Sequence, residues 1–186
     1  NSNVAGAIQI ESANVTLNTT LFFSNKTFAR FGGAIHMSDA VLTINDSYFQ
    51  FNSAIGINNQ YSGGGAIYAD NSDLSISHST FELNLAGYDQ TIGGGGSLYY
   101  LNGFGDSLYL INSELIMSAS TINENNSGIY ASQSVANITN STFYKSLYYG
   151  YHDDRGHLDF RNFSSLTLNH VTIDAAMRVE NSNLIM

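Results

Sequence analysis

The densest group of ionisable side chains lies in the segment YHDDRGH, residues 151–157. Two adjacent carboxylates, Asp153 and Asp154, follow His152, and such groups could bind a cation or transfer protons during hydrolysis of a polysaccharide. A glycoside hydrolase needs two carboxylates at a fixed separation, one of them kept protonated as the general acid. Neighbours on one loop are poorly suited to that geometry. We therefore predict a solvated charged loop and no catalytic residue; the alternative is that His152, Asp153 and Asp154 contact a partner or Ca²⁺.

Tyrosine is the other residue type that could bind a ligand, because its ring packs against sugars and proteins while its hydroxyl forms hydrogen bonds. Five tyrosines fall in three polar segments, 53–63, 85–94 and 146–156: Tyr61, Tyr88, Tyr148, Tyr149 and Tyr151. Three more each occupy the middle of a short apolar segment: Tyr68, Tyr99 and Tyr130. Both sets are candidate contact residues for protein or glycan. For the second set, the alternative is that the rings only stack and stabilise neighbouring strands.

A third kind of candidate is the Asn-x-Ser/Thr sequon, the acceptor for N-linked glycans in secreted proteins. Eight sequons begin at Asn14, Asn18, Asn25, Asn45, Asn125, Asn137, Asn140 and Asn162. We predict them as candidate glycosylation sites in a eukaryotic secretory route.

Composition excludes several other functions. The formal net charge is −9 with only six Lys and Arg residues, so little is present to neutralise the phosphates of a nucleic acid or an anionic membrane. There is no cysteine, which excludes disulfides and thiolate metal sites. No apolar run is long enough to span a membrane as a helix. Amides and hydroxyls replace most of the usual charges, which is typical of a β-rich extracellular protein.

An internal repeat indicates the elements that must position these residues. Each unit contains three short segments with alternating apolar residues. The third segments centre on Phe22, Phe49, Phe81, Ile122, Phe143 and Ile173, which are separated by 27, 32, 41, 21 and 30 residues. The second segments end on Leu17, Ile44, Ile76, Met117, Ile138 and Leu168. We assign the first segments to Ile8/Ile10, Ile35/Met37, Ile67/Ala69, Leu98/Tyr100, Ile129/Ala131 and Leu158/Phe160.

Segments this short cannot form stable hairpins alone. They can pair with the equivalent segment one unit away, at the usual strand spacing of about 4.8 Å. The repeat therefore predicts an all-β fold, a parallel β-helix of six to seven rungs with three short strands per rung and loops inserted at corners. The segments 53–63, 85–94 and 146–156 are predicted to be loops that leave equivalent corners and cluster on one edge. In this register Tyr68, Tyr99 and Tyr130 point outward on successive rungs. Asn52, Asn84 and Asn125 stack at one bend.

The motifs also resemble a known family. The segments GGAIH (32–36) and GGAIY (64–68), with FFSN (22–25), FQFN (49–52) and FELN (81–84), are similar to the GGA[ILV] and FxxN motifs of polymorphic outer-membrane protein repeats. The later units depart from this pattern, as in GGSLYY (95–100) and INEN (122–125). The resemblance implies a right-handed, pectin-lyase-like β-helix of a cell-surface protein. Polygalacturonases share that fold, but their Asn-Thr-Asp, Gly-His-Gly and Arg-Ile-Lys patterns are missing here.

These observations predict that residues 1–186 are one β-helix segment, a fragment of a longer extracellular or cell-surface chain. We expect a structural or adhesive role in a surface protein or fibre, with protein or glycan contacts at the tyrosines. More of the chain, or another copy head to tail, is expected to continue the stack. We expect no cofactor, although the acidic balance is compatible with Ca²⁺. The alternative is a carbohydrate-active enzyme, a polysaccharide lyase or glycoside hydrolase, or a carbohydrate-binding module.

Overall fold

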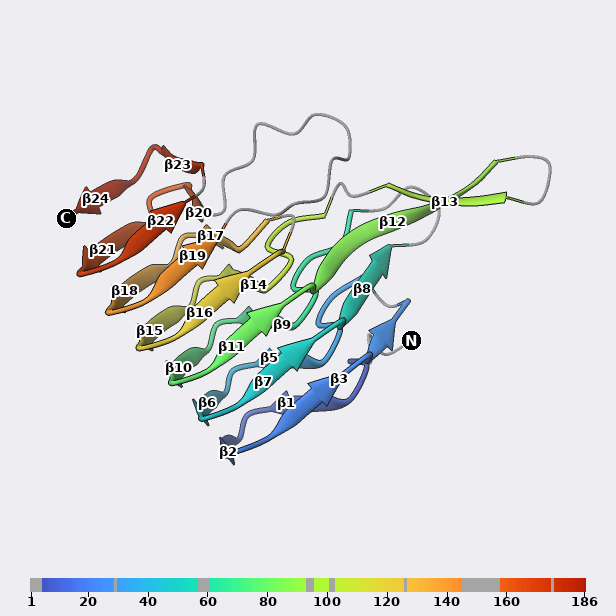
Figure 1. The fold of residues 1–186 in the computed structure, drawn as a ribbon, viewed down its shortest axis with the longest axis horizontal. Helices are drawn as coiled ribbons and strands as arrows, with labels where there is room; N and C mark the ends of the chain where they lie inside the picture. The colour runs from blue at the N-terminus through green and yellow to red at the C-terminus, as the bar shows by residue number, and fades with distance from the viewer. Residues whose placement is uncertain are drawn as a thin grey trace.

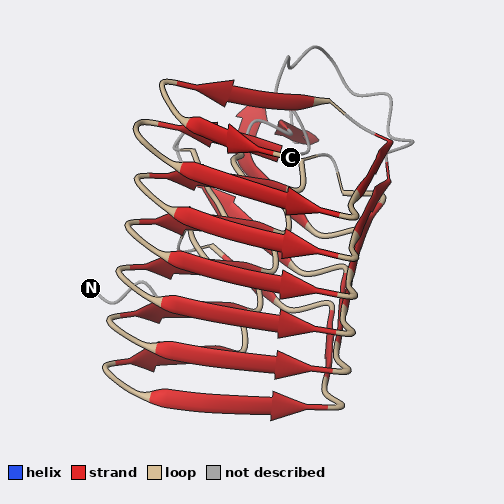
Figure 2. Ribbon diagram, turned by 90° about the vertical axis from the view of Figure 1, so that its left-hand side faces the viewer, coloured by secondary structure: helices blue, strands red, loops and turns tan. Residues whose placement is uncertain are grey.

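The computed structural model describes residues 5–28, 30–56, 61–92, 96–100, 103–125, 127–144, 158–174 and 176–186. These residues form a parallel β-helix, as predicted. The chain winds through short strands that turn at each corner, and equivalent strands of successive rungs lie side by side (Figure 1, Figure 2). Within these ranges no helix has the length and apolar character needed to cross a membrane.

Three long parallel sheets form the faces of the described part of the helix. The first sheet has seven strands: β1 (Ile8–Glu11), β5 (Ile35–Ser38), β9 (Ile67–Asp70), β14 (Leu108–Ile111), β17 (Ile129–Ser132), β20 (Leu158–Arg161) and β23 (Met177–Glu180). The second also has seven: β2 (Asn14–Asn18), β6 (Val41–Asn45), β10 (Asp73–Ser77), β15 (Glu114–Ser118), β18 (Val135–Thr139), β21 (Ser165–Asn169) and β24 (Asn183–Ile185). The third has six: β3 (Leu21–Phe23), β7 (Tyr48–Gln50), β11 (Thr80–Glu82), β16 (Thr121–Asn123), β19 (Thr142–Tyr144) and β22 (Thr172–Asp174). The predicted six to seven rungs are confirmed.

The core is built from columns of identical positions, because side chains alternate between the two faces of each strand. In β6, Leu42 and Ile44 are fully buried while Thr43 between them points outward. In the third sheet, the rings of Phe22, Phe49 and Phe81 stack with centroid separations of 4.6 and 4.7 Å. The predicted vertical alignment of these phenylalanines is confirmed.

The prediction of three strands per rung is incomplete, because a fourth strand follows the third sheet in the first three rungs. The fourth sheet contains β4 (Lys26–Thr27), β8 (Ser53–Gly56), β12 (Leu85–Ile92) and β13 (Gly96–Tyr100). The β12 and β13 strands pair antiparallel as a hairpin that projects from the body (Figure 1). We predicted 53–63 and 85–94 as loops. Their first residues instead pair with the same stretch one rung away, which satisfies their backbone groups without a long apolar pattern.

One first-sheet strand was assigned wrongly. The predicted pair Leu98/Tyr100 lies in β13 of the hairpin. Leu108 and Leu110 of β14 occupy the first-sheet position instead, beside Ile67 and Ala69. The glycines before Leu98 imitate the glycine pair that precedes the other first strands, which explains the error. The actual turn is made at Gly105, whose φ of 56° is readily adopted by glycine.

Side chains hold each bend in the same way on successive rungs. We call the bend between the first and second sheets the first bend, that between the second and third sheets the second bend, and that after the third sheet the third bend. At the third bend the predicted asparagine stack is confirmed. The backbone N–H and Nδ2 of Asn52 donate to Asn84 Oδ1 at 3.0 and 2.9 Å, and the N–H of Asn84 donates to Asn125 Oδ1 at 2.7 Å.

The first and second bends carry two serine ladders that the sequence reading missed. In the second bend, Ser79 Oγ accepts from the N–H of Ser47 at 3.1 Å and donates to the carbonyl of Ser77 at 2.7 Å. The first bend repeats this arrangement one rung after another. The ladder serines are Ser47, Ser79, Ser120 and Ser141 at the second bend, and Ser72, Ser113, Ser134, Ser164 and Ser182 at the first.

The return from the third bend to the first sheet differs from the other connections in length. We call this return the insertion edge. It consists of residues 26–34 in the first rung, 53–66 in the second, 85–107 in the third and 126–128 in the fourth. Each of these segments lies between strands that the structure describes. Past the end of the fourth sheet, the Asp106 side chain accepts hydrogen bonds in place of a further strand. Its buried carboxylate accepts from the N–H groups of Ala86 and Ser127 at 2.6 and 2.5 Å. The predicted clustering of the long segments on one edge is confirmed for these rungs.

Candidate contact surface

The outward column of the first sheet contains the predicted tyrosines, with one substitution. Tyr68 of β9 pairs with Tyr109 of β14, which pairs with Tyr130 of β17. Tyr109 therefore occupies the rung that we assigned to Tyr99, and Tyr99 lies in the hairpin strand β13. Below Tyr68 the column continues with His36, whose ring centroid is 4.9 Å from that of Tyr68.

Two phenylalanines from the insertion edge complete this aromatic column. Phe31 stacks on Tyr68 at 4.5 Å, and Phe104 lies 4.8 Å from Tyr130. The rung between them has Gly63 at the equivalent position. A Cβ on Gly63 would lie 2.2 Å from the ring of Tyr109, so a side chain there would collide with that ring. The phenylalanine before a turn glycine in FGG (31–33) and FGD (104–106) was a signal that sequence reading could have used.

The ring geometry bears on the two readings of this column. Tyr68 has His36, Phe31 and Tyr109 as ring neighbours, with interplanar angles of 23°, 26° and 52°. Much of its ring face is therefore covered by other rings, whereas sugar stacking needs an open face. This packing favours the stabilising reading for Tyr68, Tyr109 and Tyr130.

Burial changes the acid–base behaviour of this column. Burial, with a smaller contribution from the nearby Asp70 carboxylate, raises the pKa of Tyr68 to about 12. The pKa of Tyr109 is also raised by burial, with contributions from Tyr130 and Tyr68. For His36 burial lowers the pKa, while Glu11 and Asp70 oppose that change. All three groups are thus favoured in their neutral forms by desolvation, which is the behaviour of packed side chains.

Charged groups lie at both ends of the column. The guanidinium of Arg30 lies 5.1 Å from the centroid of Phe31. At the other end, Arg161 lies 5.7 Å from the ring of Tyr130 and donates from Nε and Nη2 to the nearly buried carboxylate of Asp159, at 2.7 and 2.6 Å. The hydrogen bond to Asp159 raises the pKa of Arg161. A guanidinium group therefore lies at each end of the aromatic column.

Two of the other predicted contact residues, Tyr61 and Tyr88, belong to the insertion edge. Tyr61 is 53% exposed, and its ring lies 5.8 Å from Phe104. Tyr88 belongs to β12, where it pairs with Tyr100. The remaining predicted residues lie outside the described residues: Tyr148, Tyr149, Tyr151, His152, Asp153 and Asp154. By chain order their segment falls between β19 and β20, the place where the other rungs have the insertion edge.

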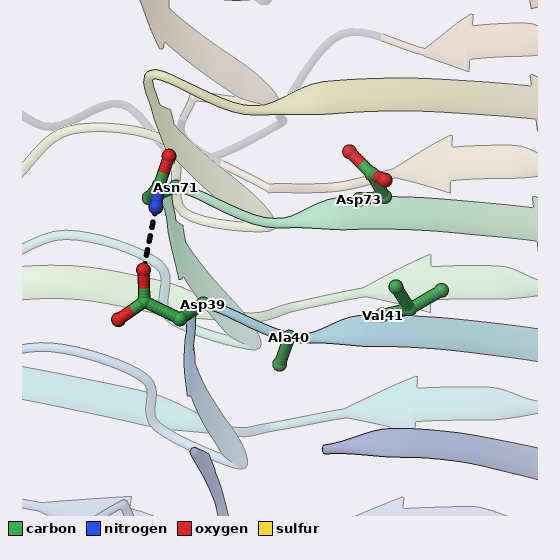
Figure 3. A pocket seen from close by; sticks show the side chains of 5 residues that line it. All are labelled: Asp39, Ala40, Val41, Asn71 and Asp73. Carbon is green, nitrogen blue, oxygen red and sulfur yellow. Dashed lines mark hydrogen bonds between the residues drawn. The ribbon is translucent and has the colours of Figure 1, made fainter. Parts of the chain in front are cut away.

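A shallow depression of about 250 Å³ lies away from both surfaces, beside the first bend (Figure 3). Its lining residues are Asp39, Ala40, Val41, Asn71 and Asp73, and Asn71 donates to the carboxylate of Asp39. Two carboxylates and an amide are a sparse oxygen set for Ca²⁺, which takes six to eight ligands. In the part of the chain that is described, no three His, Asp or Glu side chains are grouped to hold a metal ion.

The eight sequons are distributed unevenly around the helix. Asn14, Asn18, Asn45 and Asn137 lie on strands of the second sheet, while Asn140 and Asn162 lie at the bends that bound it. Asn25 and Asn125 lie in the asparagine ladder of the third bend. Asn125 is fully buried, and its Nδ2 donates to the carbonyls of Phe81 and Asn123. That geometry is incompatible with a glycan on Asn125 in the folded protein, so this predicted site is withdrawn.

No protein-family model, no curated protein and no solved structure matches this chain. The resemblance to polymorphic outer-membrane protein repeats therefore stays a sequence-based expectation, and the function has to be argued from the geometry.

Proposed function

We propose that this chain is a section of an extracellular β-helical scaffold that displays a contact edge for protein or glycan partners. One observation carries the proposal. The first and second bends are held at nearly constant length by ladders, whereas the insertion edge varies from residues 126–128 in one rung to residues 85–107 in another. A rigid framework that confines its variable segments to one edge is the usual arrangement of a recognition surface.

The side chains of the insertion edge support this proposal. Tyr61 is largely exposed there, and Tyr88 belongs to β12 of the same edge. In the sequence, the segment between β19 and β20 adds the tyrosines at 148, 149 and 151. Polar and aromatic residues together are suited to contacts with sugars or protein surfaces. The predicted extension of the stack, by more of the chain or by another copy, stays a prediction.

The test uses protein made in bacteria, which carries no N-linked glycans, on an array of extracellular glycans and matrix proteins. The matched variant replaces residues 88–101 with two glycines, because the N–H of Gly103 donates to the carbonyl of Ala86 and the ends of this segment therefore meet. We expect the wild type to bind at least one class of ligand and the folded variant to lose that binding. Equal binding by both proteins would contradict the proposal.

The enzymatic alternative is tested in parallel on acidic polysaccharides. Cleavage that the Asp154→Ala variant loses would replace the scaffold proposal with a hydrolase or lyase. We expect no depolymerisation by either protein.

A further inference from the structure

The sequons separate into two groups by what their amide nitrogens do. An N-linked glycan replaces one of the two hydrogens on Asn Nδ2 and extends from that atom into solvent. A sequon in a folded protein can therefore carry a glycan only where Nδ2 reaches solvent and does not need both hydrogens. This criterion is independent of the motif itself, since every sequon satisfies the motif.

Of the two sequons nearest the insertion edge, Asn125 fails this criterion, and Asn25 is disfavoured because its half-buried Nδ2 already donates within the ladder. Asn125 is fully buried and uses both Nδ2 hydrogens, at 2.9 Å to the carbonyl of Phe81 and at 2.7 Å to that of Asn123. Asn25 is half-buried, and its Nδ2 and backbone N–H both donate to Asn52 Oδ1 at 2.8 and 3.1 Å. Both side chains belong to the asparagine ladder that holds the third bend.

Three sequons on the opposite side satisfy it. Asn14 and Asn18 are exposed at the first and last positions of β2, and Asn140 is exposed at the second bend. Asn18 Oδ1 accepts from Asn45 Nδ2 at 2.9 Å, which leaves the Asn18 nitrogen out of that hydrogen bond. Asn45 and Asn162 are less suitable, because each donates from Nδ2 to a neighbour. Asn137 is half-buried.

The sequons that satisfy the criterion lie on one side of the β-helix. The insertion edge joins the third sheet to the first, so the second sheet is the face that it does not touch. Six of the eight sequons lie on the second sheet or its two bends, and the two that lie elsewhere are the ladder residues. Glycans on the exposed sequons would therefore coat the second sheet and leave the insertion edge bare.

We propose that the second sheet is a glycan-bearing face, with N-linked oligosaccharides on Asn14, Asn18 and Asn140, and that Asn25 and Asn125 stay unmodified in the folded protein. The proposal rests on the extracellular location in the proposed function. The donor is a lipid-pyrophosphate-linked oligosaccharide of a eukaryotic-type secretory route. The bond from Nδ2 to the sugar C1 forms, the bond from C1 to the pyrophosphate oxygen breaks, and Nδ2 loses one proton as the lipid pyrophosphate departs.

The glycan is transferred to the nascent chain before the chain folds. A glycan on a ladder asparagine would therefore be present while the third bend forms, so the glycan map tests the ladder as well as the surface. A chain glycosylated on Asn125 cannot close the third bend, because the sugar would occupy the place of the Asn125 hydrogen bonds. We therefore expect such molecules to stay inside the cell, and the secreted protein to be unmodified at Asn125.

The experiment secretes the wild-type chain from a mammalian cell line. Glycans are released enzymatically in heavy-oxygen water, which marks every formerly occupied Asn, and the peptides are analysed by mass spectrometry. We expect Asn14, Asn18 and Asn140 to be occupied in most secreted molecules and Asn25 and Asn125 in almost none. Secreted, protease-resistant protein with Asn125 occupied in most molecules would overturn the proposal, and so would empty Asn14, Asn18 and Asn140.

The control is a triple variant that keeps every asparagine, Thr16→Val, Thr20→Val and Thr142→Val, each of which removes the hydroxyl of one sequon. It should lose three glycans while keeping the β-sheet circular dichroism of the wild type. If it loses none, the three sites are wrong. Because the ligand array above uses unglycosylated bacterial protein, failure of binding there and failure of this glycan map are separate results.

Discussion

The second bend and the insertion edge solve the same problem in different ways, since each must turn the chain from one sheet to the next on every rung. The second bend uses two residues in each of its six occurrences among the described residues, with a left-handed residue such as Asp46 or His78 followed by a serine in most rungs. The insertion edge uses segments of very different length and sequence. The comparison indicates that constant length follows from a side chain that must meet its equivalent on the next rung, and that length can vary where no such side chain recurs from rung to rung.

The largest predicted effect tests this comparison directly. Inserting two glycines between Ala119 and Ser120 should shift Ser120 away from the N–H of Ser79, which it accepts at 3.1 Å, and should displace β16 from its neighbours. We expect a loss of at least about 4 kcal/mol in unfolding free energy, as for other disruptions of a buried network. The same two glycines inserted after Ile92, at the end of β12, should change stability by less than about 0.5 kcal/mol. Equal losses in urea denaturation would refute the comparison.

The asparagine ladder should give the largest effect of a single substitution. Asn84→Ala removes the acceptor of the Asn52 N–H and Nδ2 groups and the donor to the carbonyl of Phe49. Buried groups left without partners cost about 1–3 kcal/mol each, so we expect a loss of about 2–4 kcal/mol in urea denaturation. Asn123→Ala is the matched control, because this partly exposed Asn donates only at the surface, to Glu82. Its expected cost is below about 1 kcal/mol, and a similar cost for both would contradict a special role for the ladder.

A serine ladder should contribute less per rung. Ser79→Ala leaves the buried N–H of Ser47 without its acceptor and should cost about 1–2 kcal/mol in thermal or chemical denaturation. Ser77→Ala removes an outward hydroxyl that donates to Asn45, and should cost less than about 0.5 kcal/mol. If Ser77→Ala costs as much as Ser79→Ala, the ladder position is not what matters.

These two ladders also differ in how far sequence reveals them. The asparagines were predictable because each follows a large apolar residue at a fixed spacing, and Phe49 and Phe81 gave the register independently. The serines at 47, 79, 120 and 141 recur just as regularly two residues before those apolar residues. They were missed because serine is common in this chain and fits any polar turn.

The insertion edge was the least predictable part for a physical reason. Its short strands do not alternate between buried and exposed residues as the other strands do. In β8, for example, Ala54, Ile55 and Gly56 are buried in succession, so no period-two pattern marks the strand. The strand β8 and the start of β12 were therefore interpreted as loops, and the glycines before Leu98 were taken for a turn that lies instead at Gly105. Tyr68 and Tyr130 were placed correctly because each stands between two inward residues of a strand. Tyr99 has the same local pattern but belongs to the hairpin.

A smaller, pH-dependent effect is expected in the aromatic column. Burial lowers the pKa of His36 from 6.5, so the folded state favours the neutral ring. Its stabilising contribution is complete above pH 6.5 and is lost as the pH falls through the lowered pKa. The melting temperature should therefore decrease as the pH is lowered from about 7.5 to about 5.5, and this decrease should be smaller in a His36→Gln variant. The groups facing His36 are Tyr68, Glu11 and Asp70.

The control for this titration is His78→Gln, because His78 is exposed at the second bend. It should keep the pH dependence of the wild type. A His36→Gln variant with an unchanged pH profile would exclude a contribution from His36.

The smallest predicted effect concerns an exception at the first bend. The sixth rung has three residues there, Asn162, Phe163 and Ser164, where the other described rungs have two. The ladder continues through Ser164, but Phe163 is 88% exposed and both it and Asn162 have positive φ. Deleting Phe163 would restore the two-residue Asn-Ser bend seen at Asn112 and Ser113, and would remove a left-handed conformation that costs a non-glycine residue about 1–2 kcal/mol. We therefore expect the deletion to be neutral or to raise the melting temperature slightly. A clear loss of stability would show that the first bend depends on more than its ladder.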